Sequence, residues 1–465
     1  MNKLLLATSL IFSTAPAFAD PAPAAIAADI KALLAPRGSK VSMSLRDPDG
    51  GEVVSHQGEL SLSPASIAKT VSTACSLDAL GPQFQFTTNF GFSGKVTGDT
   101  LDGDLVIKGH GDPSLVIEDL HEVVEKLRHV HGIRKITGGI VFDVSYFGKK
   151  GLAIASGFEG DEGRSFTADL TPVTFNQNSF SVWVTPDVRN RAVSRATALP
   201  AGVLDLQVTN NSKTGGSTEV NLAYDPAKMK ATVVGVIGKE AEPKGIYRAV
   251  DDAYQYAQKL MQRLWIDSGG EWKSSQFKIS TTPVASTQLY KYSSRPLSKI
   301  LIDVNKLSLN LGAEMIFLAA GSEKYGTPAS YEKALKMLGE CLSEKSIEAG
   351  ALSLTNGSGL SREARIKPTA LTKFLRQAAL DNFAPEYLAS FSILGIDGTA
   401  RARLKNYAGR ARLKTGSLKD VRSIAGFLYS KDHKPYAFTM IQNGVSGEDA
   451  KVLEDRVMEA FLKKY

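Results

Sequence analysis

The chain has 465 residues and a formal net charge of +7 at pH 7, with 55 lysine and arginine residues against 48 aspartate and glutamate residues. This length exceeds what one hydrophobic core usually supports, so two or three domains are expected. The basic residues are dispersed among acidic ones without long runs of one sign, which predicts a solvated surface and argues against a nucleic-acid interface.

The first residues have the pattern of a signal peptide. Lys3 is followed by an apolar run from Leu4 to Phe12 and by Ala17-Phe18-Ala19, a small-x-small cleavage site. We expect residues 1–19 to be removed after Ala19 and the product to be exported to the periplasm. No later stretch reaches the roughly 18 apolar residues that a spanning helix needs, so no transmembrane anchor is expected.

The mature chain begins with a helix, a hairpin and a second helix. AAIAADIKALLAPRG is amphipathic and ends at proline and glycine, and KVSMSLRDPDGGEVVSH alternates around turn residues. The second helix starts near Ser66 and carries apolar residues at helical spacing as far as Leu77. Cys75 lies in that apolar pattern, which favours a buried thiol, but pairing with Cys341 in an oxidising compartment is the alternative.

From Phe84 the chain becomes rich in strands. Segments such as FQFTTNFGFSGKVTGDTLDGDLVIKG and KATVVGVIG alternate between turns, and AVDDAYQYAQKLMQRLWIDSG is an amphipathic helix. His129 and His131 suggest a metal only weakly, because two such residues lack a third ligand. A solvated helix end is the favoured interpretation.

From Leu297 helices dominate, and the chain closes with three strands and a last helix. We therefore expect an α+β fold in which both ends of the chain build one antiparallel sheet flanked by helices. Residues 20–83 and 285–465 would form this domain, and residues 84–284 would be an inserted region of one or two β-rich domains.

Three short motifs occur in order: Ser66-x-x-Lys69, Ser308-Leu309-Asn310 and Lys414-Thr415-Gly416. The first alone is weak, since Ser275/Lys278 and Ser330/Lys333 have the same spacing. Together the three form the ordered set of penicillin-binding proteins and β-lactamases.

The chemistry needs these residue types. Serine becomes a useful nucleophile when a neighbour takes its proton, and Lys69 can do so only when neutral. Burial and the nearby Lys414 would both lower the pKa of Lys69. Ser66 at a helix start would place an oxyanion beside free N–H groups, and the exposed edge of the Lys414 strand would bind an extended peptide.

A second KTG, Lys213-Thr214-Gly215, lies within NNSKTGGST. Its flanks are polar and it precedes the second motif, so we predict a surface turn there.

The chain resembles the D-alanyl-D-alanine carboxypeptidases/endopeptidases of the low-molecular-mass class C penicillin-binding proteins. The resemblance covers nearly the whole chain and includes the segments LSPASIAKTVSTACSLDALGPQFQFTT, LDGDLVIKGHGDPSL, TPVTFNQNSFSVWV, NGSGLSR, LGIDGTARAR and KTGSL. It implies that Ser66 is the nucleophile, Lys69 its base and Ser308 a proton relay to the leaving amine.

The resemblance also implies roles in binding. Asn310 would hold the substrate backbone, Lys414 would sustain the electrostatics, and Thr415 and Ser417 in the Lys414-Thr415-Gly416 segment would bind the terminal carboxylate. The N–H groups of Ser66 and Ser417 would form the oxyanion hole.

A pocket for the diaminopimelate side chain of the substrate is a further implication. Asp161 would pair with its ammonium, Arg362 with its carboxylate, and Phe166 would line the pocket, although Asp161 also suits an ordinary loop carboxylate. Two residues depart from the family pattern: Lys419 stands where a polar glutamine is common, and Asn356 where an aspartate is common.

The preferred interpretation is a serine DD-peptidase of peptidoglycan peptides that is acylated by β-lactams and needs no cofactor or metal. One alternative is a β-lactamase or serine esterase, against which stand the long insertion and Ser308, where such enzymes usually have tyrosine. The other is a non-catalytic wall-binding or β-lactam-sensing module, which would normally be tethered to a membrane or lack a catalytic group.

Overall fold

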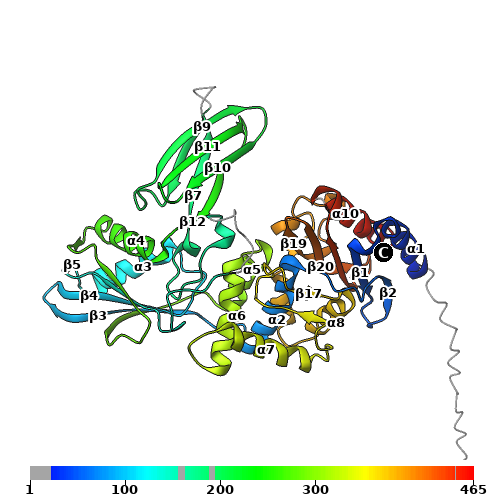
Figure 1. Cartoon of the computed structure of the whole chain (residues 1–465), viewed down its shortest axis with the longest axis horizontal. Coiled ribbons are helices and arrows are strands. Elements are labelled where there is room, and N and C mark those ends of the chain that lie inside the picture. Colours follow the sequence, from blue (N-terminus) through cyan, green and yellow to red (C-terminus); the bar gives the residue numbers. More distant parts are fainter. Residues whose placement is uncertain (1–21, 155–162, 188–193, 446) are drawn as a thin grey trace, which may run out of the picture.

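Strands from both ends of the chain form one antiparallel sheet (Figure 1). The computed structural model describes residues 22–154, 163–187, 194–445 and 447–465, so the expected signal peptide lies outside the described residues. The six strands have the order β18-β19-β20-β21-β1-β2, and β1 pairs with β21. Their bounds are β1 (Val41–Arg46), β2 (Glu52–His56), β18 (Ser392–Ile393), β19 (Ala411–Leu418), β20 (Val421–Tyr429) and β21 (Pro435–Asn443).

Helices cover both faces of this sheet, which confirms the predicted α+β class. Side chains alternate along a strand, so Ile424 on β20 and Phe438 on β21 pack against helices α1 (Ala22–Leu34) and α10 (Gly447–Lys464). Their neighbours Ala425 and Ala437 face the other layer. That layer contains α2 (Lys69–Leu80), α5 (Leu297–Lys306), α6 (Asn310–Tyr325), α7 (Tyr331–Glu344), α8 (Pro368–Ala378) and α9 (Ala384–Ala389), with the short pair β16 (Leu352–Ser353) and β17 (Arg365–Ile366) beside it.

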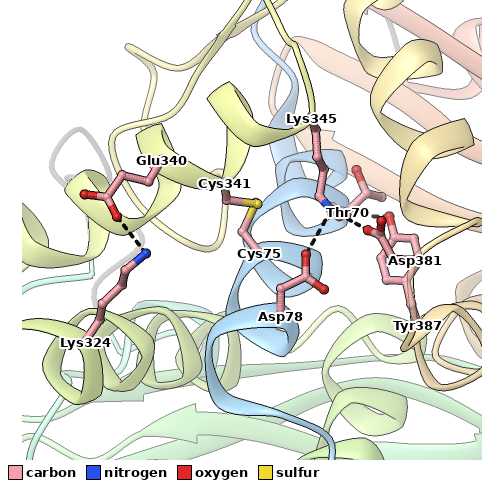
Figure 2. The surroundings of a disulfide bond; sticks show 9 residues. All are labelled: Thr70, Cys75, Asp78, Lys324, Glu340, Cys341, Lys345, Asp381 and Tyr387. Carbon is pink, nitrogen blue, oxygen red and sulfur yellow. Dashed lines mark hydrogen bonds and ion pairs between the residues drawn. A yellow bond between two sulfur atoms is a disulfide. The ribbon is translucent and has the colours of Figure 1, made fainter.

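A disulfide joins α2 to α7 (Figure 2). Cys75 and Cys341 are both buried and bonded, with Cα atoms 5.8 Å apart, so the favoured interpretation of Cys75 as a free thiol is wrong. Apolar spacing predicted burial, but only the packing of α7 on α2 brings the second sulfur within reach. Close by, Lys345 forms ion pairs with Asp78 on α2, at 3.0 Å, and with Asp381. These links fix α2, the helix that follows Ser66.

The first part of the insertion is a seven-stranded sheet covered by two helices. The helices are α3 (Ile117–Glu125) and α4 (Ala253–Asp267), which share a core with Phe142 and Ile107 of the sheet. A π-helical turn, residues 126–130, continues α3, and His129 and His131 are exposed at its end, as expected. The strands are β3 (Thr87–Thr97), β4 (Thr100–Gly109), β5 (Lys135–Ile136), β6 (Ile140–Asp143), β13 (Glu271–Trp272), β14 (Phe277–Ser280) and β15 (Thr287–Ser293).

One boundary expected from the sequence needs correction. β15 pairs with β3 from Thr287↔Phe92 to Ser293↔Thr87, so the strand that follows residue 285 belongs to the inserted sheet. The chain re-enters the helical layer only at α5, which begins at Leu297. Polar residues dominate β15 because much of the strand is exposed, so its alternation of apolar and polar residues is weak.

The second part of the insertion is a sandwich of two three-stranded sheets (Figure 1). Phe180 and Val182 of one sheet pack against Leu222 and Val233 of the other. The sheets have the orders β12-β7-β8 and β10-β11-β9. Their strands are β7 (Ser179–Pro186), β8 (Ser194–Leu199), β9 (Gln207–Gly215), β10 (Glu219–Asp225), β11 (Lys230–Gly238) and β12 (Lys244–Ala249).

The second KTG lies on a strand, so the predicted surface turn is wrong. Lys213 and Thr214 are in β9, which pairs in parallel with β11. Exposed and buried positions alternate along β9, but polar residues occupy both sets, so hydrophobicity gave no strand signal there. Within the described residues, no helix has the length and apolar character of a membrane span.

Candidate active site

Ser66 lies in a tight turn immediately before α2. The turn is a 3-10 helix, η2 (Ala65–Ala68), so α2 itself begins at Lys69, one turn later than Ser66. Ala65 has a φ of +49°, a left-handed conformation that costs a non-glycine residue about 1 to 2 kcal/mol. Ala65 and Ile67 are buried while Ser66 is partly exposed. The turn therefore presents the Ser66 side chain at the surface of an otherwise buried segment.

Lys69 is fully buried and contacts three oxygens. Its Nζ is 3.0 Å from Ser66 Oγ, 2.7 Å from Asn310 Oδ1 and 2.8 Å from the carbonyl oxygen of Ser358. Burial lowers the pKa of Lys69 to about 7, although the charge of Glu314 opposes this shift. The Asn310 and Ser358 oxygens can only accept hydrogen bonds. A neutral amine would donate both protons to them and keep its lone pair for the Ser66 hydroxyl.

The second motif meets the third through one hydrogen bond. Ser308 has a φ of +62° and lies in the turn between α5 and α6. Lys414 Nζ, which is also fully buried, donates to Ser308 Oγ at 2.9 Å and to the carbonyl of Thr415 at 2.7 Å. Burial, followed by the charge of Lys69, lowers the pKa of Lys414 well below its ordinary value. The three motifs therefore meet around two buried amines.

Gly416 allows β19 to approach Ser66. A Cβ at this position would lie 2.2 Å from Ser423 Oγ, 2.8 Å from the carbonyl oxygen of Pro64 and 3.0 Å from the backbone nitrogen of Ser66. On its outer side, β19 pairs with β18 only at Arg412 and Leu413. Among the described strands none covers that edge beyond this point, which leaves it open to an extended peptide.

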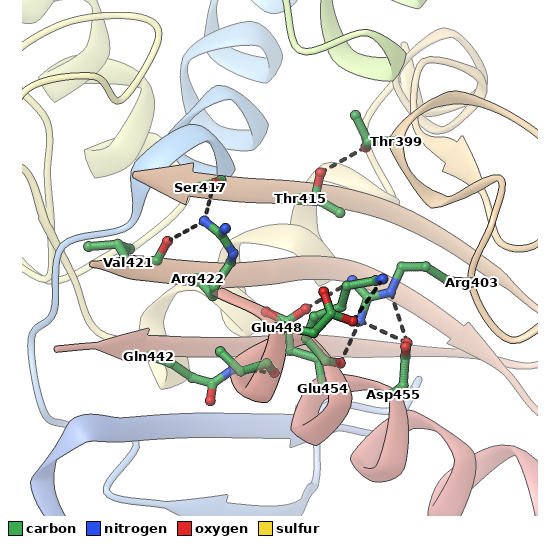
Figure 3. Close-up of polar contacts among 12 residues, drawn as sticks. Thr399, Arg403, Thr415, Ser417, Val421, Arg422, Gln442, Glu448, Glu454 and Asp455 are labelled. Atoms are coloured by element: carbon green, nitrogen blue, oxygen red, sulfur yellow. Dashed lines mark hydrogen bonds and ion pairs between the residues drawn. The ribbon is translucent and has the colours of Figure 1, made fainter. Parts of the chain in front are cut away.

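Two polar groups flank the exposed end of β19 (Figure 3). Thr415 Oγ1 donates to Thr399 Oγ1 at 2.8 Å, and the guanidinium of Arg422 donates to Ser417 Oγ. The sequence patterns did not identify Arg422 as a site residue. It lies opposite Ser417 in the β19–β20 register, so a correct hairpin pairing would have found it. The guanidinium adds a positive charge where the substrate carboxylate is expected.

Glu314 is the second group that the sequence did not single out. It is fully buried on α6, and its carboxylate accepts hydrogen bonds from the N–H groups of Gly357 and Ser358 at 2.8 and 2.9 Å. Burial raises the pKa of Glu314, while these hydrogen bonds and Lys69 oppose the rise. The available signal was a lone carboxylate within the apolar stretch NLGAEMIFLAAG, one turn after Asn310.

The residues expected around diaminopimelate are only partly placed. Asp161 lies outside the described residues. Phe166 is half-buried, and its carbonyl accepts a hydrogen bond from Asn310 Nδ2 at 3.3 Å. Arg362 forms an ion pair with Asp420 at the β19–β20 turn, where Lys419 is exposed.

Asn356 has a role that aspartate could not fill. Its Oδ1 accepts from the N–H of Gly359 at 3.1 Å, and its Nδ2 donates to the carbonyl of Ile154 at 3.2 Å. An ionised carboxylate has no proton to donate. An aspartate here could therefore accept from Gly359 but could not bond to the carbonyl of Ile154, whereas Asn356 does both.

An antiparallel sheet between helical layers, with a reachable serine bonded to a buried lysine at a helix start, defines a serine enzyme of the penicillin-binding-protein and β-lactamase fold. Comparison with known proteins gives the family. The model of the D-Ala-D-Ala carboxypeptidase 3 (S13) family matches residues 26–465, and the chain belongs to this family. It is a serine DD-peptidase.

Two curated relatives and one solved structure are similar over most of the chain. The D-alanyl-D-alanine carboxypeptidase DacB of Haemophilus influenzae is 26% identical, covering 92% of this chain and 90% of the relative. The D-alanyl-D-alanine carboxypeptidase of Actinomadura sp. is 26% identical, covering 88% and 78%. The crystal structure of penicillin binding protein 4 from Haemophilus influenzae, also solved with a β-lactam, superposes with a TM-score of 0.75 at 25% identity, covering 94% and 99%.

Proposed function

We propose that this DD-peptidase removes terminal D-alanine from peptidoglycan stem peptides and cuts D-Ala–diaminopimelate crosslinks through an acyl-enzyme on Ser66. The observation that carries the proposal is the set of three contacts of Lys69. With two protons directed at fixed acceptors, its lone pair faces the hydroxyl of Ser66. A base with a pKa of about 7 is about half unprotonated at neutral pH and mostly unprotonated at slightly alkaline pH.

The reaction then proceeds in two halves. The Ser66 proton passes to Lys69 as Oγ bonds to the D-Ala carbonyl carbon, and the N–H groups of Ser66 and Ser417 stabilise the oxyanion. The C–N bond breaks, and the leaving amine takes a proton from Ser308, which the ammonium of Lys414 replaces along their 2.9 Å hydrogen bond. In the second half, water attacks the ester and passes a proton through Ser308 to the now neutral Lys414. The ammonium of Lys69 returns its proton to Ser66 Oγ as the shortened peptide leaves, so Ser66 and both lysines recover their starting states.

The substrate lies along the open edge of β19 in this proposal. Thr415 and Ser417 bind the terminal carboxylate, and the guanidinium of Arg422 supplies a compensating charge. Asn310 holds the substrate backbone. Asp161 and Phe166 receive the diaminopimelate side chain. Arg362 gives up its ion pair with Asp420 and binds the carboxylate of this side chain instead.

We further propose a domain organisation for the chain and a periplasmic location for the enzyme. Residues 20–83 together with the chain from Leu297 onward form the catalytic unit, with the intervening region inserted as two accessory units. The signal peptide directs export to the periplasm, where peptidoglycan is reached, and is cleaved after Ala19.

A fluorescent penicillin tests the nucleophile, because a relative has been solved in complex with a β-lactam. We expect one adduct, at Ser66, when the labelled protein is mapped by mass spectrometry. An adduct at Ser275 or Ser330, or none, would refute the assignment. Rapid turnover of penicillin would favour the β-lactamase alternative instead.

The substrate is tested separately with purified muropeptides. Release of D-alanine from pentapeptides shows carboxypeptidase activity, and conversion of crosslinked dimers to monomers shows endopeptidase activity. A protein that is acylated by penicillin but leaves both muropeptides intact would contradict the proposed substrate.

A further inference from the structure

The backbone that leads into Ser66 is held at two consecutive residues. The N–H of Ser63 donates to Asn443 Oδ1 at 2.9 Å, and Asn443 Nδ2 donates to the carbonyl of Ser63 at 3.1 Å. The carbonyl of Pro64 accepts a hydrogen bond of 2.5 Å from Ser423 Oγ. One amide and one hydroxyl therefore bind three backbone groups of the segment just before η2.

Both of these side chains come from the central sheet. Ser423 lies on β20, and Asn443 is the last residue of β21, 380 residues along the chain from Ser63. Ile441 packs into the helical layer that contains α2, and Asn443, two residues further along the same strand, faces the same way. The sheet thus holds this segment through contacts that are separate from the hydrogen bonds of Lys69.

The held residues precede a backbone conformation that alanine disfavours. Ala65 has a φ of +49°. For alanine this left-handed conformation is less favourable by a factor of roughly 5 to 30, and such a residue persists where its surroundings over-determine it. The conformation of Ala65 sets the direction in which the chain presents Ser66 to Lys69. If the preceding segment were released, Ala65 would relax and the hydroxyl would move away from the amine.

We propose that Asn443 is a positioning residue: by holding the backbone of Ser63, it keeps the following turn in the shape that acylation of Ser66 requires. The inference rests on the proposed function, in which Ser66 is the nucleophile. Proton transfer needs Ser66 Oγ close to the amine of Lys69, which is 3.0 Å away, and a misplacement of about 1 Å costs roughly a hundredfold in rate. Ser423 supports the same turn one residue later.

A double-mutant cycle separates positioning from simple stabilisation. Asn443→Ala removes both hydrogen bonds to Ser63. Ala65→Gly removes the conformational penalty, because glycine adopts the left-handed conformation about as readily as the right-handed one. In the parent, we expect Asn443→Ala to lower the acylation rate at saturating penicillin about tenfold. In the background of Ala65→Gly, the same substitution should lower it less than about threefold.

Asn210→Ala is the matched control. Asn210 is also half-buried and also uses both ends of its amide on backbone groups, but it lies in the sandwich. It accepts from the N–H of Ser212 at 3.1 Å and donates to the carbonyl of Ser194 at 2.6 Å. This control should keep the parental rate. The pH midpoint of acylation should stay unchanged in every variant, because the fixed acceptors around Lys69 are not altered.

Ser423→Ala tests the same turn from a second side chain. It removes one hydroxyl and with it the hydrogen bond to the carbonyl of Pro64, so acylation should fall several-fold, and by less in the background of Ala65→Gly. Circular dichroism and urea unfolding verify that each variant is folded under the conditions of the assay.

Parental acylation rates in both Asn443→Ala and Ser423→Ala would overturn the inference. A fall of equal size with and without Ala65→Gly would also overturn it, because that pattern assigns Asn443 to stability alone. So would a shifted pH midpoint, which would place the effect on Lys69.

The same labelling separates this inference from the proposed function. If penicillin forms no adduct with the parent, or forms one away from Ser66, the proposed function fails. If the parent is acylated at Ser66 and the variants keep its rate, only the role of Asn443 fails.

Discussion

The backbone N–H of Ser358 donates a hydrogen bond to the carboxylate of Glu314 at 2.9 Å, and the carbonyl of Ser358 accepts one from Lys69 at 2.8 Å. Glu314 thus holds the backbone that presents an acceptor to the expected catalytic base. Its negative charge also acts on Lys69 directly, since it opposes the lowering of the lysine pKa by burial. We regard Glu314 as a positioning residue that acts through Ser358 and Lys69.

Glu314→Gln should change both the rate and the pH dependence of acylation by penicillin. Loss of the charge lowers the pKa of Lys69 further, so the midpoint of the rate profile moves to lower pH. The NH2 group of the glutamine also faces one backbone N–H, from which it cannot accept a hydrogen bond. Because the backbone shifts in response, the plateau rate should fall about tenfold. Stopped-flow acylation across the pH range measures both effects.

The matched control is Glu340→Gln. Glu340 is half-exposed and forms an ion pair with Lys324 at 2.6 Å, so its removal should leave the acylation profile unaltered. If Glu314→Gln lowered the rate but kept the midpoint of the parent, Glu314 would have a structural role only.

The parent protein should show a rate of Ser66 acylation that rises with pH through about 7 and then levels off. Lys69 must be neutral to take the proton, and its pKa lies at about 7 because burial penalises the ammonium. Below that pH the protonated fraction increases and the rate should fall about tenfold per pH unit. A rate that kept rising to pH 10 would show that Lys69 has an ordinary pKa.

The three motifs could be predicted from the sequence because each combines residue type with order along the chain. Lys69 and Ser66 are one helical turn apart, so local geometry sufficed for that pair. Arg422 and Glu314 could not be assigned in the same way. Arg422 reaches Ser417 through a strand register, and Glu314 reaches Ser358 across the helical layer. Hydrophobic periodicity encodes neither the register of a hairpin nor the packing of distant segments.

The fold shows the same limit. Apolar patterns at both ends of the chain predicted the shared sheet, since both strands are buried, apolar residues alternate with polar ones along β1, and apolar residues predominate in β21. The Lys213-Thr214-Gly215 end of β9 was missed and β15 was placed in the wrong domain, because polar residues occupy both faces of these segments. The pairing of Cys75 with Cys341 was left open for a further reason. The apolar spacing around Cys75 predicted its burial, but it did not predict that α7, which carries Cys341, packs against α2.

Removal of the disulfide should destabilise the helical layer that carries the catalytic site. A native disulfide contributes about 2 to 4 kcal/mol to the free energy of unfolding. Cys75→Ala/Cys341→Ala should therefore unfold at lower urea concentration, as measured by loss of penicillin binding and by circular dichroism. Reductant should shift the parent toward the variant and leave the variant unchanged. Equal midpoints for the two proteins would show that packing alone holds α2 on α7.

The two buried lysines should respond differently to arginine. Lys69→Arg keeps a cation but removes a group that loses its proton near neutral pH, so acylation should fall by roughly three orders of magnitude. Lys414→Arg keeps a donor toward Ser308 in a poorer position and should cost about tenfold to a hundredfold. Penicillin labelling rates measure both. A Lys69→Arg protein within a few-fold of the parent would show that Lys69 is not the base.

Gly416→Ala should impair acylation far more than Gly339→Ala, a substitution at an unobstructed glycine of the catalytic unit. The new Cβ would lie 2.2 Å from Ser423 Oγ, which is itself buried and bonded to the carbonyl of Pro64, and 3.0 Å from the nitrogen of Ser66. β19 must move away from η2, and a displacement of about 1 Å costs roughly a hundredfold in rate. Gly339→Ala on α7 is the control, because its Cβ meets nothing within 4 Å, and it should gain up to about 1 kcal/mol in stability with parental acylation. Parental acylation by Gly416→Ala would mean that the close approach of β19 to Ser66 is not needed for the reaction.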